Sequence, residues 1–166
     1  MPEKETIERA REDAREGKSP STQAGEFVRE EIHHIGEGKH GARSTKQAIA
    51  IGLSKARRAG VKLQPPKKGT TSEETRRAAA RDTRKARSGG RKKTSARRSR
   101  AILNRLKREG RSAASPQALV RQARSAARRR SAASRSASAK KAARTKGPAK
   151  RRAAAKKGAR TRARRG

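Results

Sequence analysis

The sequence predicts a mostly α-helical protein, with a small helical hairpin over about residues 22–36 and 44–59, isolated exposed helices, and a largely disordered basic tail. Apolar residues recur at helical spacing, and capping residues and glycines bound these stretches. Large apolar side chains are scarce, because the chain of 166 residues has only 16, nine of them between Phe27 and Leu63. So small a core cannot offset an ordering entropy of roughly 1–2 kcal/mol for every residue. Together with a net charge of +36, this composition indicates disorder over much of the chain.

The first helix of the hairpin is expected over residues 21–36. Val28, Ile32 and Ile35 fall at positions i, i+4 and i+7, and this spacing places them on one face of a helix. The glycines in residues 36–41 then indicate a helix end followed by a turn.

The second helix of the hairpin has clear start and stop signals. Ser44 and Gln47 match the capping box, in which two side chains bond the free amides of a helix start. Ile49 and Leu53 provide an apolar stripe, and Gly60 stands where a left-handed residue ends many helices.

The two helices are expected to pack against each other as the only cooperative unit of the chain. Their stripes predict that Ile49 and Leu53 face Val28 and Ile32. Because a pair of helices is marginal on its own, we expect a second copy of the chain or a protein partner to complete it.

The chain before the hairpin has mixed charge and little that could pack. Residues 2–16 are rich in helix formers, but Ile7 is their only large apolar side chain. This pattern predicts a frayed, solvated helix that ends at Gly17 and Pro20.

Beyond the hairpin, helices are expected without a core to hold them. Thr71 and Glu74 match a second capping box, and the helix that they open, to about Arg87, has no large apolar residue. Residues 95–109 carry only a narrow apolar stripe. Ser115 and Pro116 indicate one more helix start, and residues 113–166 are low in complexity, with 18 Ala and 19 Lys or Arg among 54 positions. The expected organisation is an N-terminal helix over 1–20, a hairpin module over 21–64, a basic linker with exposed helices over 65–112, and a tail over 113–166.

Charge is divided unevenly between the two halves of the chain. Residues 1–82 hold 18 Lys or Arg and 13 Asp or Glu, a net of +5, whereas residues 83–166 hold 32 Lys or Arg and the single acid Glu109, a net of +31. Such a block repels itself and is attracted to polyanions, of which duplex DNA is among the densest. Phe27 is the only aromatic residue, which argues against base stacking.

The charge pattern predicts a sequence-nonspecific DNA-binding, nucleoid-associated protein in the bacterial cytoplasm, and an RNA- or ribosome-associated protein is the alternative. Phosphate contacts position a protein without reading sequence. A membrane surface is disfavoured because no predicted helix joins a basic face to a broad apolar one. The residues expected to contact nucleic acid are the basic clusters of the C-terminal half: Arg91, Lys92, Lys93, Arg97, Arg98, Arg128, Arg129, Arg130, Lys140, Lys141, Lys150, Arg151, Arg152, Lys156, Lys157, Arg160, Arg162, Arg164 and Arg165.

No catalytic, cofactor or metal site is expected, and the chain is not expected to be an enzyme. It has no cysteine, no phosphate-binding glycine loop, no apolar run long enough to span a membrane and no recognisable secretion signal. The three histidines, His33, His34 and His40, have no clear further metal ligand beyond Glu30, Glu31 or Glu37. They are interpreted as solvated positions at a helix end.

Two resemblances accompany these patterns. Residues 38–56, GKHGARSTKQAIAIGLSKA, resemble a family of short bacterial domains of unknown function, whose hallmark is a basic glycine turn followed by S-x-K-Q-A-I-A-I-x-L-S-x-A. The likeness extends over about residues 24–63 and implies kinship rather than a mechanism. Residues 113–166 resemble in composition the Lys/Ala tails of linker histones and histone-like nucleoid proteins, although they hold more Arg and Ser.

Overall fold

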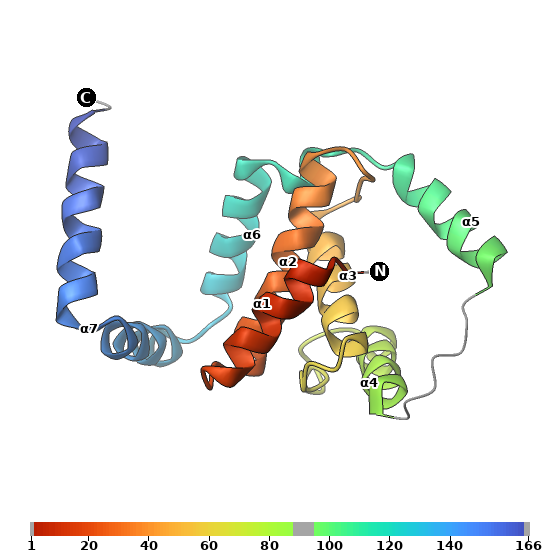
Figure 1. Ribbon diagram of the computed structural model, residues 1–166, viewed down its shortest axis with the longest axis horizontal. Helices are drawn as coiled ribbons and strands as arrows, with labels where there is room; N and C mark the ends of the chain where they lie inside the picture. Colours follow the sequence, from red (N-terminus) through yellow and green to blue (C-terminus); the bar gives the residue numbers. More distant parts are fainter. Residues whose placement is uncertain (1, 88–94, 165–166) are drawn as a thin grey trace. The chain divides into compact units, whose positions relative to one another are not determined.

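The computed structural model describes residues 2–87 and 95–164, and within these ranges it is helical without strands (Figure 1). The mostly α fold class is thus confirmed. The chain divides into two compact units, residues 1–122 and 123–166. The elements are α1 (Lys4–Arg15), α2 (Pro20–Gly36), α3 (Thr45–Arg58), α4 (Glu73–Arg87), α5 (Ala96–Lys107), the 3₁₀ turn η1 (Ser112–Ala114), α6 (Pro116–Arg128) and α7 (Ala132–Ala163).

The helical hairpin forms where the sequence predicts it, from α2 and α3, which pack against each other. Ser44 Oγ accepts a hydrogen bond from the Gln47 amide at 3.2 Å, and Gln47 Oε1 accepts one from the Arg43 amide at 2.9 Å. Gly60 has a φ of +95°, and the Val61 amide donates back to the Ala56 carbonyl at 3.1 Å. The start and end of α3 are therefore set by the capping residues that the sequence shows.

The face of α3 that meets α2 is made of small residues. Ala48, Gly52 and Ala56 are buried at intervals of four residues, and a Cβ at Gly52 would lie 2.7 Å from the Val28 Cα. Of the two large residues expected in this interface, Leu53 packs against the core cluster that contains Phe27, whereas Ile49 is only partly buried and is not among the residues of the core clusters in the described ranges. Small side chains let two helix backbones approach closely, and a stripe of large residues would hold them apart.

The N-terminal helix α1 is part of the core, so the expectation of a frayed, solvated helix is wrong. Ala10 packs with Ala24, Phe27 and Ala56, and Ile7 lies against this group, which we call the Phe27 cluster. An ion pair of 2.9 Å joins α1 to α2, from Arg9 Nε to Glu26 Oε2. The contact between α1 and α2 again depends on a small residue, because α1 contributes Ala10 to the buried cluster and has no stripe of large apolar residues.

A second cluster brings distant parts of the chain together. Ile35, Ala42, Ala48 and Ala113 pack with one another, and we call them the Ile35 cluster. The hydroxyl of Thr45 donates to the Ala113 carbonyl at 2.7 Å. This contact closes η1 onto the hairpin, so the first residue of the segment expected as the tail packs on the module.

The loop between α2 and α3 is held by backbone contacts with residues 106–110. The Gly41 amide donates to the Leu106 carbonyl at 2.9 Å, and the Ala42 amide to the Gly110 carbonyl at 3.1 Å. A Cβ at Gly41 would lie only 1.9 Å from the Glu109 carbonyl oxygen, so glycine is required there by close approach.

Helix α4 packs on α3, and the expectation that it lies fully exposed is wrong on this side. Ala79 is buried. Asp82 Oδ2 accepts a hydrogen bond of 2.6 Å from Ser54 Oγ, and Asp82 Oδ1 accepts one of 3.0 Å from Arg58 Nε. The helix ends at Arg87 as expected. Its start is capped by Ser72 and not by the expected Thr71, because Ser72 Oγ accepts a hydrogen bond from the Thr75 amide at 3.3 Å.

The C-terminal tail is helical in the structure, and its predicted disorder is not confirmed. The side chain of Ser131 caps α7 by accepting from the Ser134 amide at 3.1 Å. Gly147, with a φ of +66°, interrupts α7 immediately before Pro148. The scarcity of apolar side chains and the high net charge predict disorder, but alanine, arginine and lysine have high helix propensities, and these favour local helix formation.

Candidate nucleic-acid interface

The predicted nucleic-acid-binding residues that the structure describes are all exposed. Their side chains reach solvent from helices or from residues next to helix ends, so a polyanion can approach them without rearrangement of a core. Four of the predicted residues, Arg91, Lys92, Lys93 and Arg165, lie outside the described residues. The others lie on α5 (Arg97, Arg98), at or just after the end of α6 (Arg128, Arg129, Arg130), on α7 (Lys140, Lys141, Lys150, Arg151, Arg152, Lys156, Lys157, Arg160, Arg162) and at the C-cap of α7 (Arg164).

The basic residues of α7 surround its axis and do not form one face. Eight of the 15 residues 150–164 are Lys or Arg, and at 3.6 residues per turn their positions fall on every side of the helix. The sequence has no large apolar residue after Val120. This helix consequently has no apolar face with which to pack on a protein core or a bilayer.

Acidic groups that could neutralise this charge are almost absent from the C-terminal half. Glu109 is the only acid beyond residue 82, and its carboxylate lies 3.8 Å from Arg43 of the N-terminal half. The charge of the tail is therefore not balanced by acids of its own half.

Two arginines near the start of α7 bind backbone and hydroxyl groups, a role that the sequence analysis missed. Arg135 Nη1 donates to the Arg130 carbonyl at 2.7 Å and to the Ala127 carbonyl at 3.3 Å. Arg130 donates to Ser134 and Ser138. These carbonyls belong to the end of α6, where unpaired carbonyls attract cationic side chains. An arginine that follows the helix expected from Ser115 and Pro116 is the sequence signal for this role.

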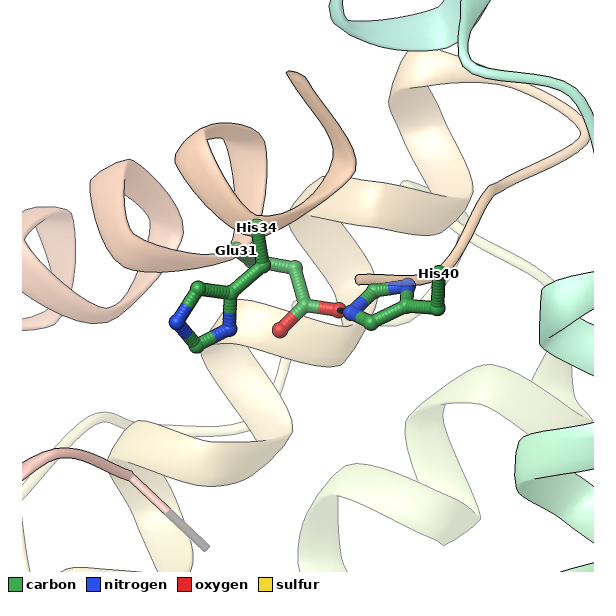
Figure 2. A group of neighbouring side chains, drawn as sticks. All are labelled: Glu31, His34 and His40. Carbon is green, nitrogen blue, oxygen red and sulfur yellow. Dashed lines mark ion pairs between the residues drawn. The ribbon is translucent and has the colours of Figure 1, made fainter. Parts of the chain in front are cut away.

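The histidines do not behave alike. The side chain of His33 is 70% exposed, as expected for a solvated position. The side chains of His34 and His40 are only 12% and 10% exposed, so for these two the interpretation as solvated positions is wrong. They lie on either side of the Glu31 carboxylate, which is 1% exposed (Figure 2).

These two histidines and Glu31 form a compact group, which we call the histidine cluster. One ligand atom from each of Glu31, His34 and His40 can be chosen so that all three lie within 4.8 Å of one another. His40 Nε2 lies 3.1 Å from Glu31 Oε1. A spacing of three residues places Glu31 and His34 on one side of α2, and that spacing is the signal that the sequence analysis overlooked.

Charged neighbours surround the histidine cluster. Lys55 Nζ lies 2.5 Å from Glu31 Oε2 and 3.4 Å from Glu30 Oε1. His34 Nε2 lies 2.8 Å from Glu3 Oε1, and this hydrogen bond, with a smaller contribution from Lys39, lowers the pKa of the Glu3 carboxyl below its ordinary value. Glu3 is thereby held as a carboxylate that accepts from His34.

No helix in the described ranges has the length and apolar character needed to cross a membrane.

A family of known sequences matches part of the chain. No curated protein and no solved structure matches the chain. The predicted likeness to a short domain of unknown function is confirmed, and it extends further toward the N-terminus than residues 24–63, in keeping with the packing of α1 on α2. Residues 5–68, which hold α2, α3 and all three members of the histidine cluster, match the model of a family of unknown function, DUF6496.

Proposed function

We propose that this chain is a sequence-nonspecific DNA-binding, nucleoid-associated protein that neutralises phosphates through its basic C-terminal half. The observation that carries the proposal is α7, a helix whose lysines and arginines are exposed on every side, in a half of the chain with a single acid. A surface of this kind supports contact with phosphates and offers little to read a base sequence.

The charge density of α7 suits a duplex. Residues 150–164 rise by roughly 22 Å along a helix axis and carry eight positive charges. Duplex DNA presents about 13 phosphate charges over the same axial length. If all eight charges neutralise phosphates, log K falls with log salt at a slope of about −7, or about four decades between about 50 and 200 mM salt.

The N-terminal half is proposed to contribute a folded module and little of the affinity. Its 82 residues have a net charge of +5, and the acids Glu26, Glu31 and Asp82 are engaged in internal ion pairs. The packed helices α1, α2 and α3 would then serve to join the basic half to a protein partner or to a second copy.

Duplex DNA is favoured over single-stranded nucleic acid by the position of Phe27. Single-strand binders stack bases on exposed aromatic rings. Phe27, the only aromatic residue of the chain, is buried in its own cluster. Structured RNA shares the phosphate chemistry of DNA, so it is the alternative against which the proposal is tested.

The test compares two full-length variants with the same change in net charge. The first replaces eight tail residues by glutamine: Lys150, Arg151, Arg152, Lys156, Lys157, Arg160, Arg162 and Arg164. The control replaces eight exposed basic residues of the N-terminal half by glutamine: Lys4, Arg11, Arg15, Lys46, Lys62, Lys67, Lys68 and Arg77.

Binding to short duplexes of unrelated sequence is measured by fluorescence anisotropy at several salt concentrations, with a structured RNA hairpin as competitor. We expect the tail variant to lose at least about 100-fold in affinity and to have a salt slope shallower by up to about 7, while the control loses less than about tenfold in affinity. Equal losses in the two variants would contradict a tail-based interface. Stronger competition by the RNA hairpin than by duplex DNA would instead support the RNA- or ribosome-associated alternative.

A further inference from the structure

We propose that Glu31, His34 and His40 form a binding site for a divalent transition metal of the zinc class. One carboxylate oxygen and two imidazole nitrogens are ligand types that Zn²⁺ uses. Glu31 and His34 come from neighbouring turns of α2, and His40 comes from the loop that follows (Figure 2). Three ligands from two segments would tie this loop to the helix.

The distances are close to those that a metal needs. Ligand atoms bonded at about 2.1 Å in a tetrahedral arrangement lie about 3.4 Å apart. Glu31 Oε1 and His40 Nε2 are already 3.1 Å apart, and no pair among the three ligand atoms is separated by more than 4.8 Å. The set therefore closes on a metal with side-chain movements on the order of 1 Å.

The hydrogen bond of His40 to the backbone determines which of its ring nitrogens carries the proton. His40 Nδ1 lies 3.1 Å from the Gly41 carbonyl oxygen. A carbonyl can only accept, so Nδ1 bears the proton and donates. The neutral ring then presents its Nε2 lone pair to the buried Glu31 carboxylate, which is an unfavourable approach. Either a second proton or a metal ion between the two atoms removes this repulsion.

His34 is oriented in the same way by its own partner. Its Nε2 lies 2.8 Å from Glu3 Oε1, and the carboxylate accepts, which leaves Nδ1 as the nitrogen with the lone pair. Histidine ligands characteristically donate a hydrogen bond from the N–H of their second ring nitrogen to a carboxylate or a backbone carbonyl. His34 and His40 each have one of these two partners.

The Glu31 carboxylate lacks the hydrogen bonds that a buried carboxylate requires. Both oxygens are buried, and neither accepts a hydrogen bond within the described part of the chain. Lys55 and His40 lie near enough to form ion pairs, but their approach does not meet the directions of a hydrogen bond. A metal on Oε1 would supply the missing ligand and leave Lys55 on Oε2.

The local charge also favours a divalent cation. Counted as carboxylates, Glu3, Glu30, Glu31 and Glu37 contribute four negative charges, and Lys39 and Lys55 contribute two positive ones; all six side chains are linked by ion pairs to the cluster or to one another. With both imidazoles neutral, the surroundings carry a net charge of −2. In a chain with a net charge of +36, this is a local environment in which a doubly charged ion is not repelled.

The experiment uses the untagged full-length chain after treatment with a chelator, titrated with Zn²⁺ by calorimetry and with Co²⁺ by visible absorption. We expect one equivalent of metal, the intense visible absorption of four-coordinate Co²⁺, and a melting temperature that rises with Zn²⁺ concentration. His34→Ala and His40→Ala should each lower Zn²⁺ affinity at least about 100-fold. The matched control is His33→Ala, one residue away and largely exposed, which should leave the affinity unchanged.

A second measurement uses the wild-type chain alone, so its result does not depend on whether the histidine variants fold. Imidazole ¹⁵N spectra of the wild-type chain should show Zn²⁺ shifting the resonances of His34 Nδ1 and His40 Nε2, with His33 unaffected. The proposal is overturned if His40 is doubly protonated and its spectrum does not respond to Zn²⁺, because a proton then takes the place of the metal. It is equally overturned if His33→Ala weakens binding as much as His40→Ala does.

Discussion

Replacing Gly52 by alanine should leave the protein less stable than replacing Gly25 by alanine, although both glycines lie inside helices of the same hairpin. A Cβ at Gly52 would lie 2.7 Å from the Val28 Cα and 3.0 Å from the Phe27 carbonyl oxygen. A Cβ at Gly25 meets nothing within 4 Å. The two variants thus share one chemical change and differ only in the space around it.

The magnitudes follow from two opposing effects. Alanine in place of glycine stabilises a helix interior by roughly 0.8–1.0 kcal/mol. Adding a methyl group to a packed interface costs about 1–3 kcal/mol, and the closest atoms to Gly52 are backbone, which cannot turn aside as a flexible side chain can. Gly25→Ala should therefore gain about 1 kcal/mol in the free energy of unfolding, whereas Gly52→Ala should lie about 1–3 kcal/mol below it.

The assay is urea unfolding of the full-length chain followed by far-ultraviolet circular dichroism, together with thermal melts. A difference of 1 kcal/mol shifts the midpoint by roughly 4–8 °C for a folded part of this size, so the two variants should be separated by at least about 4 °C. Equal stabilisation by both substitutions would refute the close approach of α2 and α3 on which the reasoning depends.

Three further outcomes are expected from other contacts. Gly41→Ala should release residues 106–114 from the hairpin, because the added Cβ would overlap the Glu109 carbonyl; faster amide exchange at Ala42 and Ala113 measures this, and unchanged exchange would contradict it. Asp82→Ala should lower the free energy of unfolding by about 1.5–3 kcal/mol because it removes the hydrogen bonds to α3. Glu73→Ala, which breaks an exposed pair with Arg76, should lower it by less than about 1 kcal/mol. Urea unfolding measures both values, and equal losses would count against the packing of α4 on α3. Duplex DNA should stabilise α7 against thermal unfolding as phosphates relieve like-charge repulsion, and an unchanged circular dichroism melt at saturating DNA would argue against this.

The local structure could be predicted from the sequence because its signals are local. Ser44, Gln47 and Gly60 bound α3 through hydrogen bonds and a backbone angle that involve only near neighbours. The spacing of Val28 and Ile32 likewise depends on the helical repeat alone. The existence and the ends of the two hairpin helices were therefore accessible before any tertiary contact was known.

Tertiary packing was not predictable because small residues make it. A search for large apolar side chains selects Ile49, whereas the contact with α2 runs through Ala48 and Gly52. The sequence predicts a turn at Gly41, whereas in the structure this glycine leaves room for the backbone of residues 106–110 to pack against it. These positions have a methyl side chain or none, and a search for large apolar residues does not detect them.

The histidine cluster lies between these two cases. Glu31 and His34 have the helical spacing that brings two ligands together, and this part could have been predicted. The burial of His40 depends on the path of the loop after α2, which Gly41 and its partners determine. A sequence pattern specifies two of the three groups, and tertiary structure supplies the third.

The distribution of acids links the folded module to the proposed role of the tail. Of the 14 acidic residues, 13 lie in residues 1–82, and several of them pair with basic groups of the same region, such as Glu26 with Arg9 and Asp82 with Arg58. These acids stabilise contacts between α1, α2, α3 and α4, and for that reason they are already neutralised. The C-terminal half, with a net charge of +31 over residues 83–166, then has few intramolecular competitors for its charge. The concentration of acids in the N-terminal half thus supports the ion pairs between its helices, and it also leaves the basic C-terminal half available to an external polyanion.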